Sequence, residues 1–300
     1  MLQLELHQMD NPQDALRQFA ERASRYSFDL NGKVRKEDNF VALRGGHATV
    51  YSGILQPDGS RVAIKMARGC LPGDESTIKR VLKEVHLWSK LRHENIVPVL
   101  GITTEFELTV SIVSPWMEKR DARKHVQDTS IDPRPLMIDI ARGLQYLHTR
   151  EEGAVFHGNL KGANVLISDG GQVLLADFGF SHLVDSSFSM AVSGKGGFTM
   201  QWTAPEIFLG EQEASAKADI WSFGMTLLEL LMRKDPFHGI KRNGIIGKMY
   251  RNEIPDRPRD EETFSRLTDG WWDICLRCWN FDPSLRPTIA HVLQVMTNLQ

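Results

Sequence analysis

The pattern of hydrophobic and polar positions begins with a helical repeat. Asn11 and Pro12 suit an N-cap followed by a first helical position. The apolar residues that follow recur at helical spacing, so an amphipathic helix is expected over roughly 11–26. A turn-forming sequence at 29–32 comes after this segment.

From about residue 38 to 115 the pattern becomes typical of β-strands. Residues 49–54 and 61–67 are rich in residues that favour strands, and a turn-forming stretch separates them. One helix interrupts this part, because apolar residues recur with a 3.6-residue period from Ile78 to Leu91. A small lobe built mainly of strands is therefore predicted here.

After about residue 118 helical patterns dominate. Residues 136–148 form a strongly amphipathic repeat, and residues 220–232 are apolar almost all round. The second of these helices should therefore lie buried at the centre of its lobe. Short strands are expected at 165–168 and 173–176.

These segments together predict an α+β fold with two lobes. We assign residues 1–37 to an N-terminal extension, 38–116 to the small β-rich lobe with one helix, and 117–300 to a larger, mainly helical lobe. A cleft between the lobes is the expected binding site.

Composition narrows the class of protein. Hydrophobic residues make up 41% and charged residues 25%, as in ordinary globular proteins. The net charge of −2 gives no reason to expect a nucleic-acid partner. No apolar run reaches the ~18–20 residues of a membrane span, and the N-terminus does not resemble a signal peptide. Three cysteines cannot build a disulfide framework, so a cytoplasmic location is expected.

The candidate chemistry begins with Lys65, at the end of the apolar strand 62–65. A buried lysine needs a carboxylate partner, and Glu84 on the following helix is the candidate. More motifs follow in order: His157-Gly158-Asn159 with Lys161 and Asn164, Asp177-Phe178-Gly179, Ala204-Pro205-Glu206, Asp219-Ile220-Trp221 and Arg286-Pro287.

This ordered set resembles the eukaryotic protein-kinase family over about residues 38–298. The stretches 114–117, 160–164 and 278–283 are similar to the tyrosine-kinase-like branch, in the style of its fungal members. The resemblance implies that the chain binds ATP and magnesium and engages a protein substrate or a protein partner.

The resemblance also implies which residues form the nucleotide site. Lys65 would hold the phosphates and be positioned by Glu84. Asp177 and Asn164 would ligate magnesium, because both offer hard oxygen ligands. The adenine would lie among Val50, Ala63 and Leu166 and bond to backbone groups near Pro115 and Met117. The phosphate loop would include Gly45 and Gly46.

Other positions concern the substrate and the framework. In the family, a lysine at the place of Lys161 accompanies phosphorylation of Ser and Thr, and Thr199 occupies the matching place in the substrate-facing loop. Asp219 would hold the catalytic loop. Glu206 and Arg286 would form a buried ion pair.

Three departures from the family pattern affect function. Asn159 stands where the family has the aspartate that accepts the proton of the substrate hydroxyl, and an amide cannot take up a proton. Gly158 replaces an arginine that, in the family, pairs with a phosphorylated activation loop. The phosphate loop keeps one of its three usual glycines, at Gly45, so weaker positioning of ATP is expected.

The sequence leaves three functions open. The first is a kinase-like domain, naturally decayed or deliberately inactivated, that binds ATP and magnesium but transfers phosphate poorly or not at all. The second is an active Ser/Thr kinase that tolerates Asn159, and the third is an interaction scaffold without nucleotide.

Two structural expectations accompany these functions. Trp88 is bulky enough to push its helix outward and separate Lys65 from Glu84. We expect the basic stretch 119–125 to be a solvated face; the alternative is that it contacts a substrate.

Overall fold

The computed structural model describes residues 27–38, 40–44, 48–67, 75–106, 109–178, 182–183, 199–210 and 212–299. The helix expected at 11–26 lies outside the described residues, as do Gly45 and Gly46. Contacts divide the chain into two compact units. The small unit is Met1–Arg92 with Val97–Trp116, and the large unit is His93–Ile96 with Met117–Gln300.

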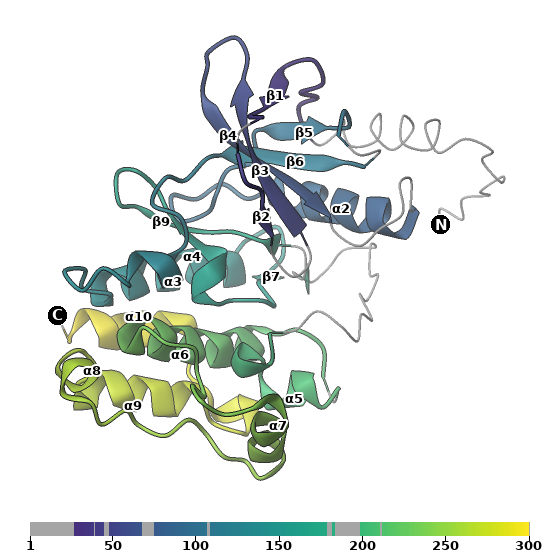
Figure 1. Ribbon diagram of the computed structural model, residues 1–300. Coiled ribbons are helices and arrows are strands. Elements are labelled where there is room, and N and C mark those ends of the chain that lie inside the picture. Colours follow the sequence, from purple (N-terminus) through teal and green to yellow (C-terminus); the bar gives the residue numbers. More distant parts are fainter. Residues whose placement is uncertain are drawn as a thin grey trace. The chain divides into compact units, whose positions relative to one another are not determined.

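A six-stranded sheet forms the centre of the small unit, with antiparallel neighbours in the order β1-β3-β4-β6-β5 and β2 paired to β3 (Figure 1). The helix α2 packs beside β6. The elements are β1 (Val34–Lys36), β2 (Leu43–Arg44), β3 (Ala48–Leu55), β4 (Arg61–Ala67), α2 (Glu75–Trp88), β5 (Gly101–Thr103) and β6 (Ser111–Pro115).

Alternation along β4 builds the core of this unit. Val62, Ile64 and Met66 are buried, whereas Ala63 and Lys65 between them are half-buried. Because successive side chains of a strand point to opposite faces, the first three share one face with the core residues of neighbouring strands. Ala63 and Lys65 therefore lie on the other face, where the sequence analysis expects the nucleotide.

An additional strand-like segment lies along β5. Leu30 N–H donates to the carbonyl of Ile102 at 2.8 Å, and Ile102 N–H donates to the carbonyl of Phe28 at 2.9 Å. A side chain at Gly101 would collide with the same Phe28 carbonyl, so this close approach requires glycine. Residues assigned from the sequence to an N-terminal extension thus complete the sheet of the small unit.

Asn31 fixes the end of this segment. Its Oδ1 accepts from the backbone N–H of Thr104 at 2.8 Å and from the hydroxyl of Thr103 at 2.9 Å. The turn signal at this point of the sequence therefore marks a side chain that bonds to a strand about seventy residues away, and Leu30 beside it is buried in the core.

The large unit is mainly helical. Two small antiparallel sheets, β10-β7 and β8-β9, accompany the helices. The elements are α3 (Ala122–His125), α4 (Arg134–His148), β7 (Val155–Phe156), η1 (Gly162–Asn164), β8 (Val165–Ile167), β9 (Val173–Leu175), β10 (His182–Leu183), η3 (Met200–Trp202), α5 (Pro205–Phe208), α6 (Ala216–Met232), α7 (Arg242–Tyr250), α8 (Glu261–Arg266), α9 (Asp269–Cys278), η4 (Pro283–Leu285) and α10 (Ile289–Thr297).

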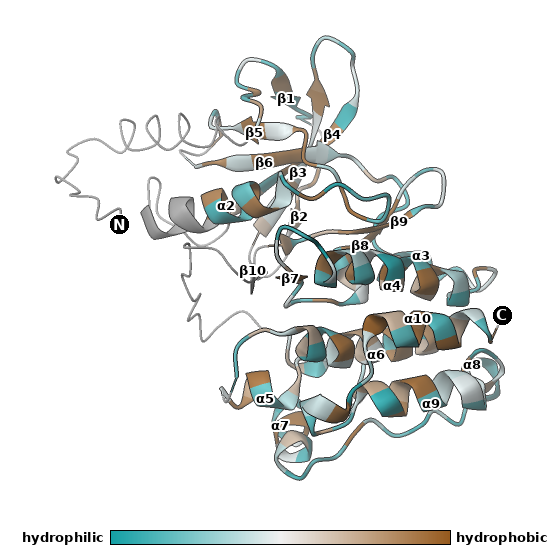
Figure 2. Ribbon diagram, turned by 180° about the vertical axis from the view of Figure 1, so that it is seen from behind, coloured by the Kyte–Doolittle hydropathy of each residue, from teal (hydrophilic) through white to brown (hydrophobic). Residues whose placement is uncertain are grey.

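The helix α6 is the centre of this unit, as its apolar sequence predicts. Every residue from Ala218 to Leu231 is buried, and the helix contacts both α4 and α9. Ser215 caps its start, because the hydroxyl accepts from Ala218 N–H at 3.1 Å. By contrast, the described turns of α2 carry both hydrophobic and hydrophilic residues (Figure 2).

The predicted fold class is confirmed, with a small β-rich unit that carries one helix among its described residues and a larger, mainly helical unit. In the part of the chain that the structure describes, no helix combines the length and the apolar character that a membrane crossing requires.

Candidate active site

In the small unit, Lys65 on β4 and Glu84 on α2 form an ion pair. The distance from Nζ to Oε1 is 2.6 Å, and the side chains are 20% and 8% exposed. Two charges this far removed from water require each other, because an unpaired partner would carry a large desolvation cost. The pair fixes the direction of the lysine ammonium group on the face of the sheet opposite the core.

Trp88 does not displace α2, contrary to the expectation from its size. The indole is 3% exposed, and Nε1–H donates to the carbonyl of Val97 at 2.5 Å. The side chain therefore fills a buried space and anchors the end of the helix, which leaves Glu84 within reach of Lys65. The volume of the indole is visible in the sequence, whereas this acceptor is visible only in the structure.

The residues expected around the adenine come from both units. Val50 faces Lys65 across β3 and β4, while Ala63 faces Ser114 and Val62 faces Pro115 across β4 and β6. In the large unit, Leu166 lies half-buried on β8 and Met117 precedes α3. The structure therefore brings Val50, Ala63 and Pro115 together on one sheet, with Met117 and Leu166 in the other unit.

In the large unit, Asp219 holds the backbone of the predicted catalytic loop. Its carboxylate accepts from His157 N–H at 2.8 Å and from Gly158 N–H at 2.9 Å. The ring of His148 adds a third contact at 2.9 Å. Because Asp219 belongs to the buried helix α6, it ties this loop to the buried centre of the unit.

Asn159 lies half-buried in this loop, and its backbone is bonded on both sides. Its N–H donates to His157 Nδ1 at 3.3 Å, and its carbonyl accepts from Asn164 Nδ2 at 2.7 Å. The second bond uses the donor end of the Asn164 amide. The Oδ1 atom of Asn164 is thereby oriented as an oxygen ligand, which suits magnesium.

Asp177 has a left-handed backbone, with φ +68°. This conformation is uncommon for residues other than glycine and persists only where the surroundings enforce it. Its neighbours do so, because Ala176 O lies 3.1 Å from His157 Nε2 and the ring of Phe178 is buried 5.4 Å from that of His157. A carboxylate and the Asn164 amide are together a hard oxygen donor set, so the residues present fit a magnesium ion.

Gly158 also has a left-handed backbone, with φ +72°. The sequence shows that the family's arginine is missing here but gives no reason for a glycine. The structure supplies one, because glycine adopts this conformation without the steric cost of a side chain. The loop can therefore keep its bonds to Asp219 without strain at this residue.

On the predicted substrate side, Lys161 and Thr199 are bonded to each other. Nζ of Lys161 donates to the Thr199 hydroxyl at 2.6 Å. Burial lowers the pKa of the lysine, while the negative charges of Asp177 and Glu229 raise it. The two residues that indicate Ser/Thr chemistry in the sequence thus meet in one unit.

Glu229 is a site residue that the sequence reasoning missed. Its Oε2 accepts from Gly162 N–H and from Trp202 Nε1–H, both at 2.8 Å. Burial raises the pKa of this carboxyl to about 7, although both bonds lower it. The available signal was the one acidic residue among the largely apolar positions 220–232.

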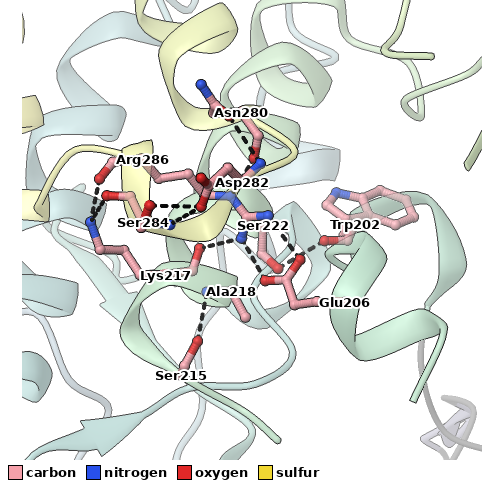
Figure 3. Close-up of polar contacts among 10 residues, drawn as sticks. All are labelled: Trp202, Glu206, Ser215, Lys217, Ala218, Ser222, Asn280, Asp282, Ser284 and Arg286. Atoms are coloured by element: carbon pink, nitrogen blue, oxygen red, sulfur yellow. Dashed lines mark hydrogen bonds and ion pairs between the residues drawn. The ribbon is translucent and has the colours of Figure 1, made fainter. Parts of the chain in front are cut away.

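The predicted pair of Glu206 and Arg286 is almost completely buried and bidentate, with distances of 2.6 and 2.8 Å (Figure 3). The guanidinium also donates to the carbonyls of Asn280 at 2.7 Å and Lys217 at 2.9 Å. The ammonium group of Lys217 in turn donates to the carbonyl of Arg286. This network ties α5, the start of α6 and the segment before α10 together.

Comparison with known proteins identifies the class that these features define. The profile of the protein kinase domain matches residues 44–296. The chain therefore belongs to the protein kinase domain family.

Several relatives have names that state a kinase type. "Probable serine/threonine-protein kinase drkD" of Dictyostelium discoideum is 32% identical over 264 residues, which cover 85% of this chain and 19% of the relative. "Probable serine/threonine-protein kinase DDB_G0284251" of the same organism is 31% identical over 255 residues, with shares of 84% and 49%.

A plant protein is similar to the same degree. "Mitogen-activated protein kinase kinase kinase 3" of Arabidopsis thaliana is 32% identical over 263 residues, which cover 83% of this chain and 40% of the relative. The chain thus spans between about a fifth and a half of the length of these relatives, and its similarity to them concerns the kinase domain.

Proposed function

We propose that this chain is a kinase-like domain that binds ATP and magnesium but transfers phosphate to Ser or Thr poorly or not at all. The observation that carries the proposal is Asn159 at the position of the catalytic aspartate, in a loop that is otherwise held in place by Asp219. We also propose that the domain belongs to the tyrosine-kinase-like branch of the family, where it is similar to the fungal members. We propose a cytoplasmic location for it.

Binding of ATP and magnesium is supported by side chains in each unit. The Lys65–Glu84 pair at 2.6 Å presents an ammonium group suited to phosphate oxygens. Asn164 and Asp177 offer the oxygen ligands that magnesium requires. Magnesium would neutralise phosphate charge at this place, and the protein residues would orient the ion.

Impaired transfer follows from the chemistry of an amide. A general base is typically worth about 10²–10⁴-fold in rate, and Asn159 cannot accept a proton from a hydroxyl. The substitution is nearly isosteric, and the bonds of the Asn159 backbone to His157 and Asn164 do not involve its side chain. The loss should therefore concern proton transfer, with the fold of the loop preserved.

The preference for Ser and Thr is supported by the Lys161–Thr199 bond at 2.6 Å and by relatives whose names state this specificity. The lysine is held at the loop that the sequence analysis assigns to the substrate. A protein substrate or protein partner is therefore proposed to dock at this side of the large unit.

The test compares purified native protein with the Asn159→Asp variant. We expect both to show a thermal shift with ATP and magnesium, and only the variant to phosphorylate itself and a generic Ser/Thr substrate, with a rate at least about 10²-fold higher. Asn159→Asp combined with Asp177→Asn serves as the control, since it restores the base but removes a magnesium ligand.

Other outcomes would contradict the proposal in defined ways. Substantial transfer by the native protein, close to that of the Asp variant, would show an active kinase that tolerates Asn159. No thermal shift in either protein would indicate an interaction scaffold that works without nucleotide.

A further inference from the structure

A cluster of basic side chains lies at the beginning of the large unit. We call it the α3 patch, and it consists of Lys119, Arg120, Arg123 and Lys124. Lys119 and Arg120 are exposed, and the side chains of Arg123 and Lys124 are 50% and 55% exposed. All four therefore present positive charge to solvent.

Acidic neighbours offset only part of this charge. Arg123 lies 3.1 Å from Asp235, and Lys124 lies 3.4 Å from Asp121. Lys119 and Arg120 form no ion pair with the described residues. An exposed ion pair contributes little and remains accessible to another anion. The patch thus keeps an excess of cationic groups.

Arg120 occupies a position that favours glycine. Its φ is +62°, and its N–H donates to the carbonyl of Met117 at 3.0 Å in a tight turn. A residue with a side chain pays a steric cost in this conformation. The turn does not need the guanidinium, so the arginine side chain remains available for an external partner.

The patch continues toward the predicted substrate side of the same unit. The helix α3, which carries Arg123 and Lys124, contacts η1 directly after Lys161. In agreement with this contact, the positive charge of Arg123 lowers the pKa of both Lys161 and Glu229. Lys161 itself is bonded to Thr199. The part of the α3 patch that belongs to α3 therefore lies close to the loop that contains Asn159.

We infer that the α3 patch binds an acidic peptide segment of a protein partner. The carboxylates or phosphates of such a segment would pair with Lys119 and Arg120 and compete for Arg123. A peptide is favoured over other anions because α3 contacts η1, which directly follows Lys161, and Lys161 bonds to Thr199. These two residues are the ones that the proposed function assigns to a protein substrate. The inference concerns binding alone, and its choice of a peptide rests on the proposed function.

The test is fluorescence anisotropy with four labelled peptides of about twelve residues, in the absence of nucleotide. One peptide is rich in Asp and Glu, one carries phosphoserines to the same net charge, one has Gln at these positions and one has Lys. We expect the two acidic peptides to bind, the other two to bind at least about tenfold more weakly, and added salt to reduce the difference. Preference between the two acidic peptides identifies carboxylate or phosphate as the ligand.

Two variants assign the binding to the patch. Lys119→Glu combined with Arg120→Glu should weaken acidic-peptide binding by about tenfold or more. Arg120→Gly should weaken it less while relieving the left-handed backbone, so this variant stays folded and separates lost charge from lost structure. Lys241→Glu combined with Arg242→Glu is the control, because it makes the same charge change at exposed residues beside α7.

Equal weakening by the patch and control variants would overturn the inference and indicate a general charge effect. Equal binding of the acidic and Gln peptides would also overturn it, and the patch would then be a solvated face. Neither result depends on phosphoryl transfer, so each is distinguishable from a failure of the proposed function.

Discussion

The buried carboxyl of Glu229 should make the stability of the large unit depend on pH near neutrality. This side chain is 1% exposed and connects the catalytic loop, through Gly162 N–H, to η3, through Trp202 Nε1–H. Burial raises its pKa from 4.5 to about 7 and outweighs both hydrogen bonds. Ionisation of Glu229 therefore places a charge where water cannot solvate it.

The sign of the effect follows from proton binding. Because the pKa in the native state is the higher one, the native protein binds more protons than the unfolded chain between pH 4.5 and about 7. The stabilising contribution is fully present below pH 4.5 and is lost as the pH rises through about 7. A difference of about 2.5 in pKa, at about 1.4 kcal/mol for each pKa unit, gives a total loss of about 3.5 kcal/mol.

The Glu229→Gln variant tests this reasoning. Its amide oxygen can still accept from Gly162 and Trp202, but the side chain does not titrate. Urea unfolding should show the variant gaining about 2.5 kcal/mol relative to the native protein between pH 5 and 8, because part of the total loss already occurs below pH 5. The exposed Glu213→Gln is the control and should follow the native protein. If Glu229→Gln and native protein change in parallel over this range, the carboxyl does not titrate between pH 5 and 8 in the folded protein, and the reasoning is wrong.

Two further predictions concern stability. Arg286→Met leaves Glu206 buried without its partner, so the free energy of unfolding in urea should fall by about 3–5 kcal/mol. Adding Glu206→Gln should recover part of this loss, because the unpaired charge is then removed. If nothing is recovered, the pair does not have this role. Asn31→Ala removes the acceptor for Thr103 and Thr104 and should cost about 1–3 kcal/mol by the same measurement. An unchanged midpoint would show that this segment does not stabilise the small unit.

Features that depend on local pattern could be predicted from the sequence. β4 has the predicted bounds of 61–67, and α6 contains the predicted buried helix at 220–232. Regular alternation and continuous apolar character are both visible within a single segment. The ordered motifs also indicated the kinase family, which the comparison with known proteins confirmed.

Features that depend on distant partners could not be predicted in this way. The pairing of residues 28–32 with β5 joins segments about seventy residues apart, and Asn31 has the local signature of a turn. The size of Trp88 suggested a clash, but the carbonyl of Val97 accepts its indole N–H. A sequence shows which groups are present, whereas these outcomes depend on which groups meet.

The positions of Gly158 and Asn159 argue for separating geometry from chemistry in this domain. The Asp219 carboxylate accepts hydrogen bonds from the N–H groups of His157 and Gly158. Gly158 adopts its left-handed backbone without steric cost. The catalytic loop is thus built from contacts that do not require the missing aspartate or the missing arginine. A loop that keeps its shape without these residues can continue to orient Asn164 through the carbonyl of Asn159. Under the proposed function, introducing one carboxylate at this position should therefore be enough for transfer without rebuilding the site, and Asn159→Asp tests this.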